Sequence, residues 1–137
     1  MFLVDTSVWI EIFRAHNGLD IEQIVVFDDI VTCLPVIQEV LQGFSKESAF
    51  RAARDAMFNL PIVEDPIEAS LVEDAVALYR AARRRGITVR SSVDCIIAAC
   101  AIRHDLEVLH RDRDFEGLAQ VSALRARGLG EAALPRQ

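Results

Sequence analysis

The chain has 137 residues, 52% of them hydrophobic and 26% charged, and its formal net charge is −6. This length predicts a single domain over residues 1-137 with a loose tail from about Gly128, and the composition excludes a disordered protein. The negative net charge excludes a uniformly basic nucleic-acid-binding protein. No apolar run approaches the ~18 residues of a membrane helix, and no basic segment precedes the first apolar run as in a signal peptide, so we expect a cytoplasmic protein.

Short apolar runs alternate with helical patterns along the chain. Strands that alternate with helices predict an α/β fold, in which helices cover both faces of a mainly parallel sheet. Ligands bind such a sheet outside the carboxyl ends of its strands. In chain order, the predicted elements are a strand at 2–5, helices at 6–14 and 21–27, a strand at 30–33, helices at 35–43 and 46–58, an edge strand at 60–63, helices at 67–85 and 93–104, a strand at 106–109, a helix at 115–120 and a strand at 121–124.

Two acidic residues follow the first two strands. Asp5 ends the apolar run 2–4 and precedes two hydroxyl residues, so it lies at the carboxyl end of the first strand. A helix N-cap is the ordinary explanation of an aspartate in this place. Glu39 lies in the first turn and a half of the helix after the second strand and faces the same edge. Taken alone, Glu39 is an ordinary surface glutamate.

Asp94 is the single charged residue of the otherwise apolar segment 93–102. A helix that is apolar all round is buried on all sides, and a buried carboxylate without a partner is unstable by several kcal/mol or takes up a proton. Ser91 precedes Asp94 by three residues, which is the spacing of a capping box at a helix start. A cation shared with other carboxylates is the alternative partner.

Asp112 and Asp114 follow the strand at 106–109 and precede a helix, so either is also a candidate helix cap. Caps favour the same junctions as catalytic acids, and the convergence of five acids therefore does not decide between the two roles. Carboxylates without histidine or cysteine at ligand spacing suit Mg²⁺ or Mn²⁺. Such a cation activates water for attack on a phosphodiester and offsets the repulsion between the acids and a polyanion.

Arginine supplies fourteen of the fifteen basic residues and clusters at 80–90 and at 103–113. Its guanidinium binds phosphate oxygens in a two-pronged geometry. The alternative is a solvated helix end with favourable placement relative to the helix dipole.

Four segments carry a resemblance to a known family: Val4-Asp5-Thr6-Ser7-Val8-Trp9, the isolated Glu39, Val93-Asp94-Cys95-Ile96-Ile97-Ala98-Ala99 and His110-Arg111-Asp112-Arg113-Asp114-Phe115. In this order and spacing the chain resembles PIN-domain ribonucleases, and more narrowly the VapC toxins of bacterial type II toxin–antitoxin systems. The resemblance implies a three-layer α/β/α sandwich and a Mg²⁺-dependent endoribonuclease, with Mn²⁺ as an alternative ion.

Carried over by position, the resemblance makes Asp5 and Asp94 the metal ligands. Glu39 and Asp112 would complete the acidic cluster, and Asp114 would be a supporting acid, since family members differ over which of these two aspartates is used. Thr6 would be the hydroxyl that orders the site. We further expect Thr6 or Ser7 to cap the first helix and leave Asp5 free for the metal.

The same resemblance implies an RNA substrate, a homodimer and a cognate antitoxin whose C-terminal segment lies in an apolar groove near the early helices. Trp9, Ile12 and Phe13 would contribute to that groove, although plain core packing explains them equally well. Nothing in the sequence selects among tRNA, rRNA and mRNA.

Two other functions compete with this one. A metal-dependent phosphatase that uses Asp5 as nucleophile typically needs a second acid two residues later, where this chain has Ser7, and a lysine, of which Lys46 is the single example. A catalytically silent PIN-like interaction module would normally have lost one of the acids, and none is missing.

Overall fold

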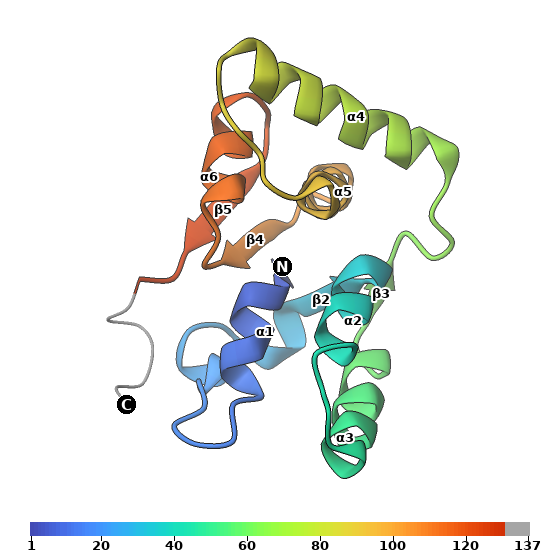
Figure 1. Ribbon diagram of the computed structural model, residues 1–137, viewed down its shortest axis with the longest axis vertical. Coiled ribbons are helices and arrows are strands. Elements are labelled where there is room, and N and C mark those ends of the chain that lie inside the picture. The colour runs from blue at the N-terminus through green and yellow to red at the C-terminus, as the bar shows by residue number, and fades with distance from the viewer. Residues whose placement is uncertain (131–137) are drawn as a thin grey trace.

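The computed structural model describes residues 1–130 as an α/β sandwich built on one five-stranded parallel sheet (Figure 1). The strands are β1 (Phe2–Val4), β2 (Ile30–Cys33), β3 (Ile62–Val63), β4 (Glu107–His110) and β5 (Arg125–Gly128), in the spatial order β3-β2-β1-β4-β5. The helices are α1 (Thr6–Ile12), α2 (Leu34–Leu41), α3 (Glu47–Phe58), α4 (Ala69–Arg84), α5 (Ser92–Arg103) and α6 (Arg113–Gln120). The predicted α/β class is confirmed.

The helices form two layers, one on each side of the sheet. Connections between parallel strands are right-handed, so the change of direction after β3 moves the following helices to the opposite face. Figure 1 shows α1, α2 and α3 below the strands and α4, α5 and α6 above them. The sandwich therefore has the three layers that the sequence predicts.

The strand order reverses between β1 and β4, which creates a switch point at the centre of the sheet. Val4 pairs with Leu109 in the parallel ladder, and the Asp5 backbone N–H donates to the Leu109 carbonyl at 2.9 Å. The loops after β1 and β4 leave the sheet toward opposite layers, and ligand sites of α/β proteins form in the crevice between such loops.

Burial explains why two helices of the upper layer, α4 and α5, differ in their sequence patterns. On α4 the buried residues Leu71, Ala75, Leu78 and Ala82 form one stripe, as in an amphipathic helix with one solvated side. On α5 seven of twelve residues are buried, from Asp94 to Ala101, because this helix lies beneath α4. Asp94 is thus carried into the interior by the most buried helix.

Two predicted elements differ from the structure. The helical segment predicted at 21–27 is reduced to short 3-10 helices at Ile21–Gln23 and Phe27–Asp29. The Asp20 side chain caps the first turn, and the β-branched residues at 24–26 do not favour its continuation. The last strand is Arg125–Gly128 and not 121–124, where Ser122 forms a turn by bonding the Leu118 carbonyl and the Leu124 N–H.

Smaller corrections concern one helix start and the chain end. Pro35 is the second residue of α2, one position later than predicted. The loose tail was predicted from Gly128, but Gly128 pairs with His110, and the N–H of the buried Leu129 donates to the His110 carbonyl at 2.8 Å. The rest of the predicted tail, at 131–137, lies outside the described residues.

None of the helices within residues 1–130 combines the length and the apolar character that a membrane span requires.

Candidate active site

Asp5 combines two roles in one carboxylate. It is the N-cap of α1, where its Oδ2 accepts hydrogen bonds from the Ser7 backbone N–H at 3.0 Å and the Ser7 hydroxyl at 2.6 Å. Its Oδ1 is buried and has no hydrogen-bond partner among the described residues. Burial raises the pKa of Asp5, while the bonds from Ser7 oppose that shift. The prediction that Thr6 or Ser7 caps the helix instead is wrong, because Asp5 caps it with one oxygen and leaves the other unpaired.

Ser7 and Arg111 join the start of α1 to the end of β4, a connection that sequence reasoning missed. The Ser7 hydroxyl donates to Asp5 and accepts from the Arg111 backbone N–H at 2.9 Å. The Arg111 guanidinium lies 3.2 Å from Oε1 of Glu11, which is only 7% exposed. The sequence held one indication of this contact. Glu11 lies three residues after the apolar Val8 and therefore on the same, inward side of the short helix.

Glu39 reaches the same edge of the sheet from α2. It is half-buried, and its Oε1 accepts a hydrogen bond from the Thr6 hydroxyl at 3.0 Å. Burial raises the pKa of Glu39, and the negative charges of Asp5 and Asp112 raise it further. The Thr6 hydroxyl therefore fixes Glu39 directly, whereas Ser7 fixes Asp5.

Asp94 lies in the first turn of α5 and is 4% exposed. Ser91 occupies the N-cap position but makes no side-chain capping bond, so the capping-box alternative is not realised. Asp94 Oδ2 has no hydrogen-bond partner among the described residues. Burial, a hydrogen bond with the Asp114 carboxyl and the charge of Asp5 raise the pKa of Asp94 to about 9. Without a compensating cation, this carboxyl holds a proton at neutral pH.

Asp112 and Asp114 differ in what holds them. Asp112 is half-buried and caps α6, with its Oδ1 accepting from the Asp114 N–H at 2.9 Å. Asp114 is buried and accepts from the backbone N–H groups of Arg90 and Ser91 at 2.9 and 3.0 Å. Asp114 thus attaches the segment before α5 to α6, which fixes the start of α5 relative to the end of β4.

His110 is a second residue that sequence reasoning missed. Its Nδ1 accepts a hydrogen bond from the Asp112 backbone N–H at 3.1 Å, so the proton of the neutral ring is on Nε2, which lies 3.3 Å from Glu116 Oε1. Burial lowers the pKa of His110 and favours this neutral form. The histidine positions the backbone of Asp112, and no metal-ligand spacing in the sequence would have indicated it.

Three of the five acids lie close enough together to share a divalent cation. Oxygen atoms of Asp94, Asp112 and Asp114 all lie within 4.8 Å of one another. Asp5 belongs to the same electrostatic group, because its charge raises the pKa of both Asp94 and Glu39. The unpaired buried oxygens of Asp5 and Asp94 require a partner, and an all-carboxylate set suits Mg²⁺ or Mn²⁺.

All of the predicted site residues lie at the carboxyl edge of the sheet, around the switch point between β1 and β4. They are Asp5, Thr6, Glu39, Asp94, Asp112 and Asp114. Their individual catalytic roles stay predictions.

Comparison with known proteins identifies the family. A family model for the PIN domain matches residues 2–121. VapC ribonuclease Mb1587 of Mycobacterium bovis is 38% identical over 133 residues, which cover 92% of this chain and 97% of that relative. The chain belongs to the PIN-domain family of VapC ribonucleases. Ribonuclease VapC11 of Mycobacterium tuberculosis matches this VapC-type chain with the same identity and coverage. The predicted resemblance is confirmed.

Solved structures share the fold of this PIN domain. VapBC-5 of Mycobacterium tuberculosis aligns with a TM-score of 0.69 and 22% identity over 93% of this chain and 97% of that one. VapBC2 of Rickettsia felis, solved on a DNA fragment from its promoter, aligns with a TM-score of 0.75 and 14% identity over 94% and 98%. A toxin–antitoxin complex of Klebsiella pneumoniae is 26% identical over 85% and 92%, with a TM-score of 0.67.

Proposed function

We propose that this PIN-domain protein is a divalent-metal-dependent endoribonuclease and the toxin of a type II toxin–antitoxin pair. The observation that supports this most strongly is the pair of buried, unpaired carboxylate oxygens on Asp5 and Asp94, beside three further acids. Such a cation would strengthen the binding of RNA by an acidic protein, because it offsets the repulsion between the five carboxyl groups and the phosphodiester.

Each residue has a proposed task in this reaction. Asp5 and Asp94 hold Mg²⁺ or Mn²⁺, and Glu39 and Asp112 complete the negative cluster, with Asp114 in support. When bound, the cation neutralises phosphate charge and acidifies water at the site. Ser7, Thr6 and His110 make no contact with substrate in this scheme and keep the acids in position.

Cleavage of total cellular RNA in Mg²⁺ or Mn²⁺ tests the proposal. The wild type should give defined fragments. Asp5→Asn should be at least ~100-fold slower, since even residues that only support a metal site are worth 10–100-fold. Equal cleavage by both proteins would indicate a contaminating nuclease. Absence of cleavage by the wild type would favour the silent interaction module.

An antitoxin is the second part of the proposal, supported by the antitoxin that accompanies the Klebsiella toxin in its complex. A shallow hollow of about 150 Å³ between α1 and α2 is lined by Ile10, Phe13, Val40, Gly43 and Phe44. Ile10 is 59% exposed, and its apolar surface suits a hydrophobic segment of the antitoxin.

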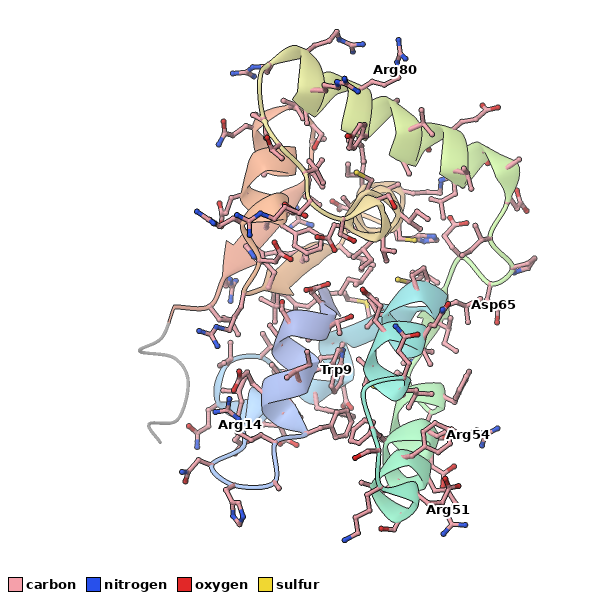
Figure 2. The ribbon with its side chains drawn as sticks, in the orientation of Figure 1. Trp9, Arg14, Arg51, Arg54, Asp65 and Arg80 are labelled. Carbon is pink, nitrogen blue, oxygen red and sulfur yellow. The ribbon has the colours of Figure 1, made fainter. Side chains whose placement is uncertain are left out.

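The residues expected at this groove divide between surface and interior. Phe13 lines the hollow and packs edge-on against Phe44 at 5.7 Å. Trp9 is 4% exposed and stacks on Phe13, and it lies on the side of α1 that faces α2 (Figure 2). Ile12 is half-buried in the core. Trp9 therefore supports the groove and does not line it.

A homodimer is the third part of the proposal. Val72, Val76 and Tyr79 lie at i, i+4 and i+7 on α4 and are 44%, 52% and 40% exposed. They line a hollow of about 490 Å³ that continues onto α5 through Cys95 and Ile96. A second copy of the chain would cover this apolar face. We place the protein in the cytoplasm, where its proposed RNA substrate is found.

A further inference from the structure

A second hollow lies directly beside the acidic cluster, on the side of β5. It measures about 370 Å³ and is lined by Arg111, Asp112, Arg113, Glu116 and Gly128, among others. We call it the Arg113 hollow. A Cβ on Gly128 would lie 3.2 Å from Glu116 Oε1 and 3.4 Å from His110 Cε1. A side chain at this position would therefore press on the residues that line the hollow. This volume falls within the range of small-ligand pockets.

The two arginines of the hollow differ in their partners. The Arg111 guanidinium is paired with Glu11 at 3.2 Å, and its charge is thereby compensated within the fold. Arg113 is exposed and makes no side-chain hydrogen bond or ion pair with the described residues. A guanidinium that residues 1–130 leave unpaired, beside a proposed site for a polyanion, is available to an external anion.

Glu116 would be the natural partner of Arg113, since residues three apart on a helix are neighbours. Its Oε1 instead lies 3.3 Å from Nε2 of His110. The Glu116 carboxylate thus lies beside the His110 ring and makes no ion pair with Arg113. Arg113 is also the first residue of α6, where the helix dipole adds positive potential.

We propose that the Arg113 hollow binds an RNA phosphate adjacent to the one that is cleaved, with the Arg113 guanidinium as its ligand. This inference rests on the proposed nuclease function and adds the subsite that positions the substrate. Arginine suits this task because its planar donor pair matches two phosphate oxygens. The phosphate charge is also the feature common to every RNA sequence, so this contact gives affinity without sequence preference.

Binding of a fluorescein-labelled single-stranded RNA of mixed sequence, followed by anisotropy, tests this subsite. All variants carry Asp94→Asn to prevent cleavage; an amide closely resembles the protonated carboxyl, so the fold should be kept. Arg113→Ala should weaken binding roughly tenfold, as expected for a charge-assisted contact. It should also lower the slope of log K against log salt by about 0.7, the loss of one phosphate contact on a single strand.

Two controls separate a local contact from a general charge effect. Arg80→Ala removes the same charge from α4. Arg80 lies at the top of Figure 2, far from α1, and its replacement should change the affinity for RNA less than twofold. Arg113→Lys should keep the salt slope, because the positive charge remains. It should lose part of the affinity, because lysine lacks the planar pair of N–H donors of a guanidinium. Thermal melts of each variant check that folding is unchanged.

The outcomes distinguish this inference from the proposed function. If the protein without Asp94→Asn cleaves RNA, but Arg113→Ala and Arg80→Ala bind alike, the subsite is wrong and the nuclease stands. If binding depends on Arg113 but no cleavage occurs under any metal, the nuclease is wrong and the RNA subsite stands. If the wild type neither binds nor cleaves RNA, both are wrong.

Discussion

At the scale of single residues, Asp94 is the acid whose surroundings most disfavour a negative charge. Its carboxyl is buried by α5, shares a hydrogen bond with Asp114 and lies in the field of Asp5 and Asp112, so its pKa rises to about 9. Each of these effects penalises the charged form. The proposed divalent cation would reverse this balance, because it would replace the proton and stabilise the carboxylate.

The titration of Asp94 gives a prediction for the metal-free protein. The folded state keeps a proton that the unfolded chain releases near pH 3.8, so stability is fully present below that value and is lost as pH rises toward about 9. Burial lowers the pKa of His110, so above pH 7 this residue is neutral in the folded and the unfolded state and does not affect the pH dependence. In that range the free energy of unfolding should fall by up to ~1.4 kcal/mol per pH unit. Urea titrations from pH 7 to 9 measure this slope.

Asp94→Asn is the matched variant for that experiment. The slope should become shallower, because the largest proton difference between the folded and unfolded states is gone. Addition of Mn²⁺ at pH 8.5 should raise the melting temperature of the wild type and not of the variant. An equal rise in both would show that the ion binds elsewhere.

The positions of the acids were predictable from sequence, but their hydrogen bonds were not. Asp5, Glu39, Asp112 and Asp114 follow predicted strands, which gives their place at the sheet edge. Asp94 follows no strand, and it was recognised as the single charge of an apolar helix. The partners of Asp114 come from the backbone of Arg90 and Ser91, at separations of 24 and 23 residues. Such contacts depend on how α5 packs against α6, which no local pattern encodes.

At the scale of elements, the approach of α6 to the segment before α5 fixes the geometry of the acids. A Cβ added to Gly117 on α6 would lie 2.7 Å from the Cγ2 of Ile87, so the glycine allows the two segments to pack closely. That packing places the backbone donors of Arg90 and Ser91 against Asp114.

Gly117→Ala should therefore destabilise the fold by about 1–3 kcal/mol through overpacking, despite the better helix propensity of alanine. It should also reduce the rise in melting temperature caused by Mn²⁺, because α6 moves away from the segment it holds. Ile87→Ala in the same chain should recover part of both effects by making room. Gly43→Ala is the control, since its Cβ would meet ordinary contacts of 3.4 Å and more.

The elements that sequence patterns placed wrongly share a physical cause. Strand β5 carries Arg125 and Arg127, whose guanidinium groups pair with Asp105 and Glu107 at 3.1 and 3.2 Å. An edge strand that is stabilised by ion pairs lacks the run of apolar residues that predicts a strand. The more apolar segment 121–124 therefore fits the pattern of a strand better than 125–128 does. In contrast, the central strands are buried and were located to within one or two residues.

At the scale of the whole molecule, two apolar surfaces lie on opposite layers of the sandwich. Ile10 belongs to the lower layer with α1, and Val76 to the upper layer with α4 (Figure 1). The proposed antitoxin and the proposed second copy therefore use separate surfaces and do not compete.

Two charge substitutions test this separation. Val76→Arg should convert a dimer into a monomer in light scattering, since it places a guanidinium in the apolar face of α4. Ile10→Arg should leave the dimer intact and weaken binding of the antitoxin. A wild type that is monomeric at micromolar concentration, or a Val76→Arg variant that still dimerises, would contradict the proposed face.

The switch point of the sheet also has a consequence for the timing of synthesis. Asp5 follows β1 and Asp112 follows β4, a separation of 107 residues (112 − 5), and the bond from Arg111 to Ser7 spans 104. At 5–20 residues per second the ribosome needs roughly 5–20 s to pass from one aspartate to the other. A nascent chain therefore cannot assemble its acidic cluster until most of it has been made. The order of strands thus links the completion of the acidic cluster to the near-completion of the chain.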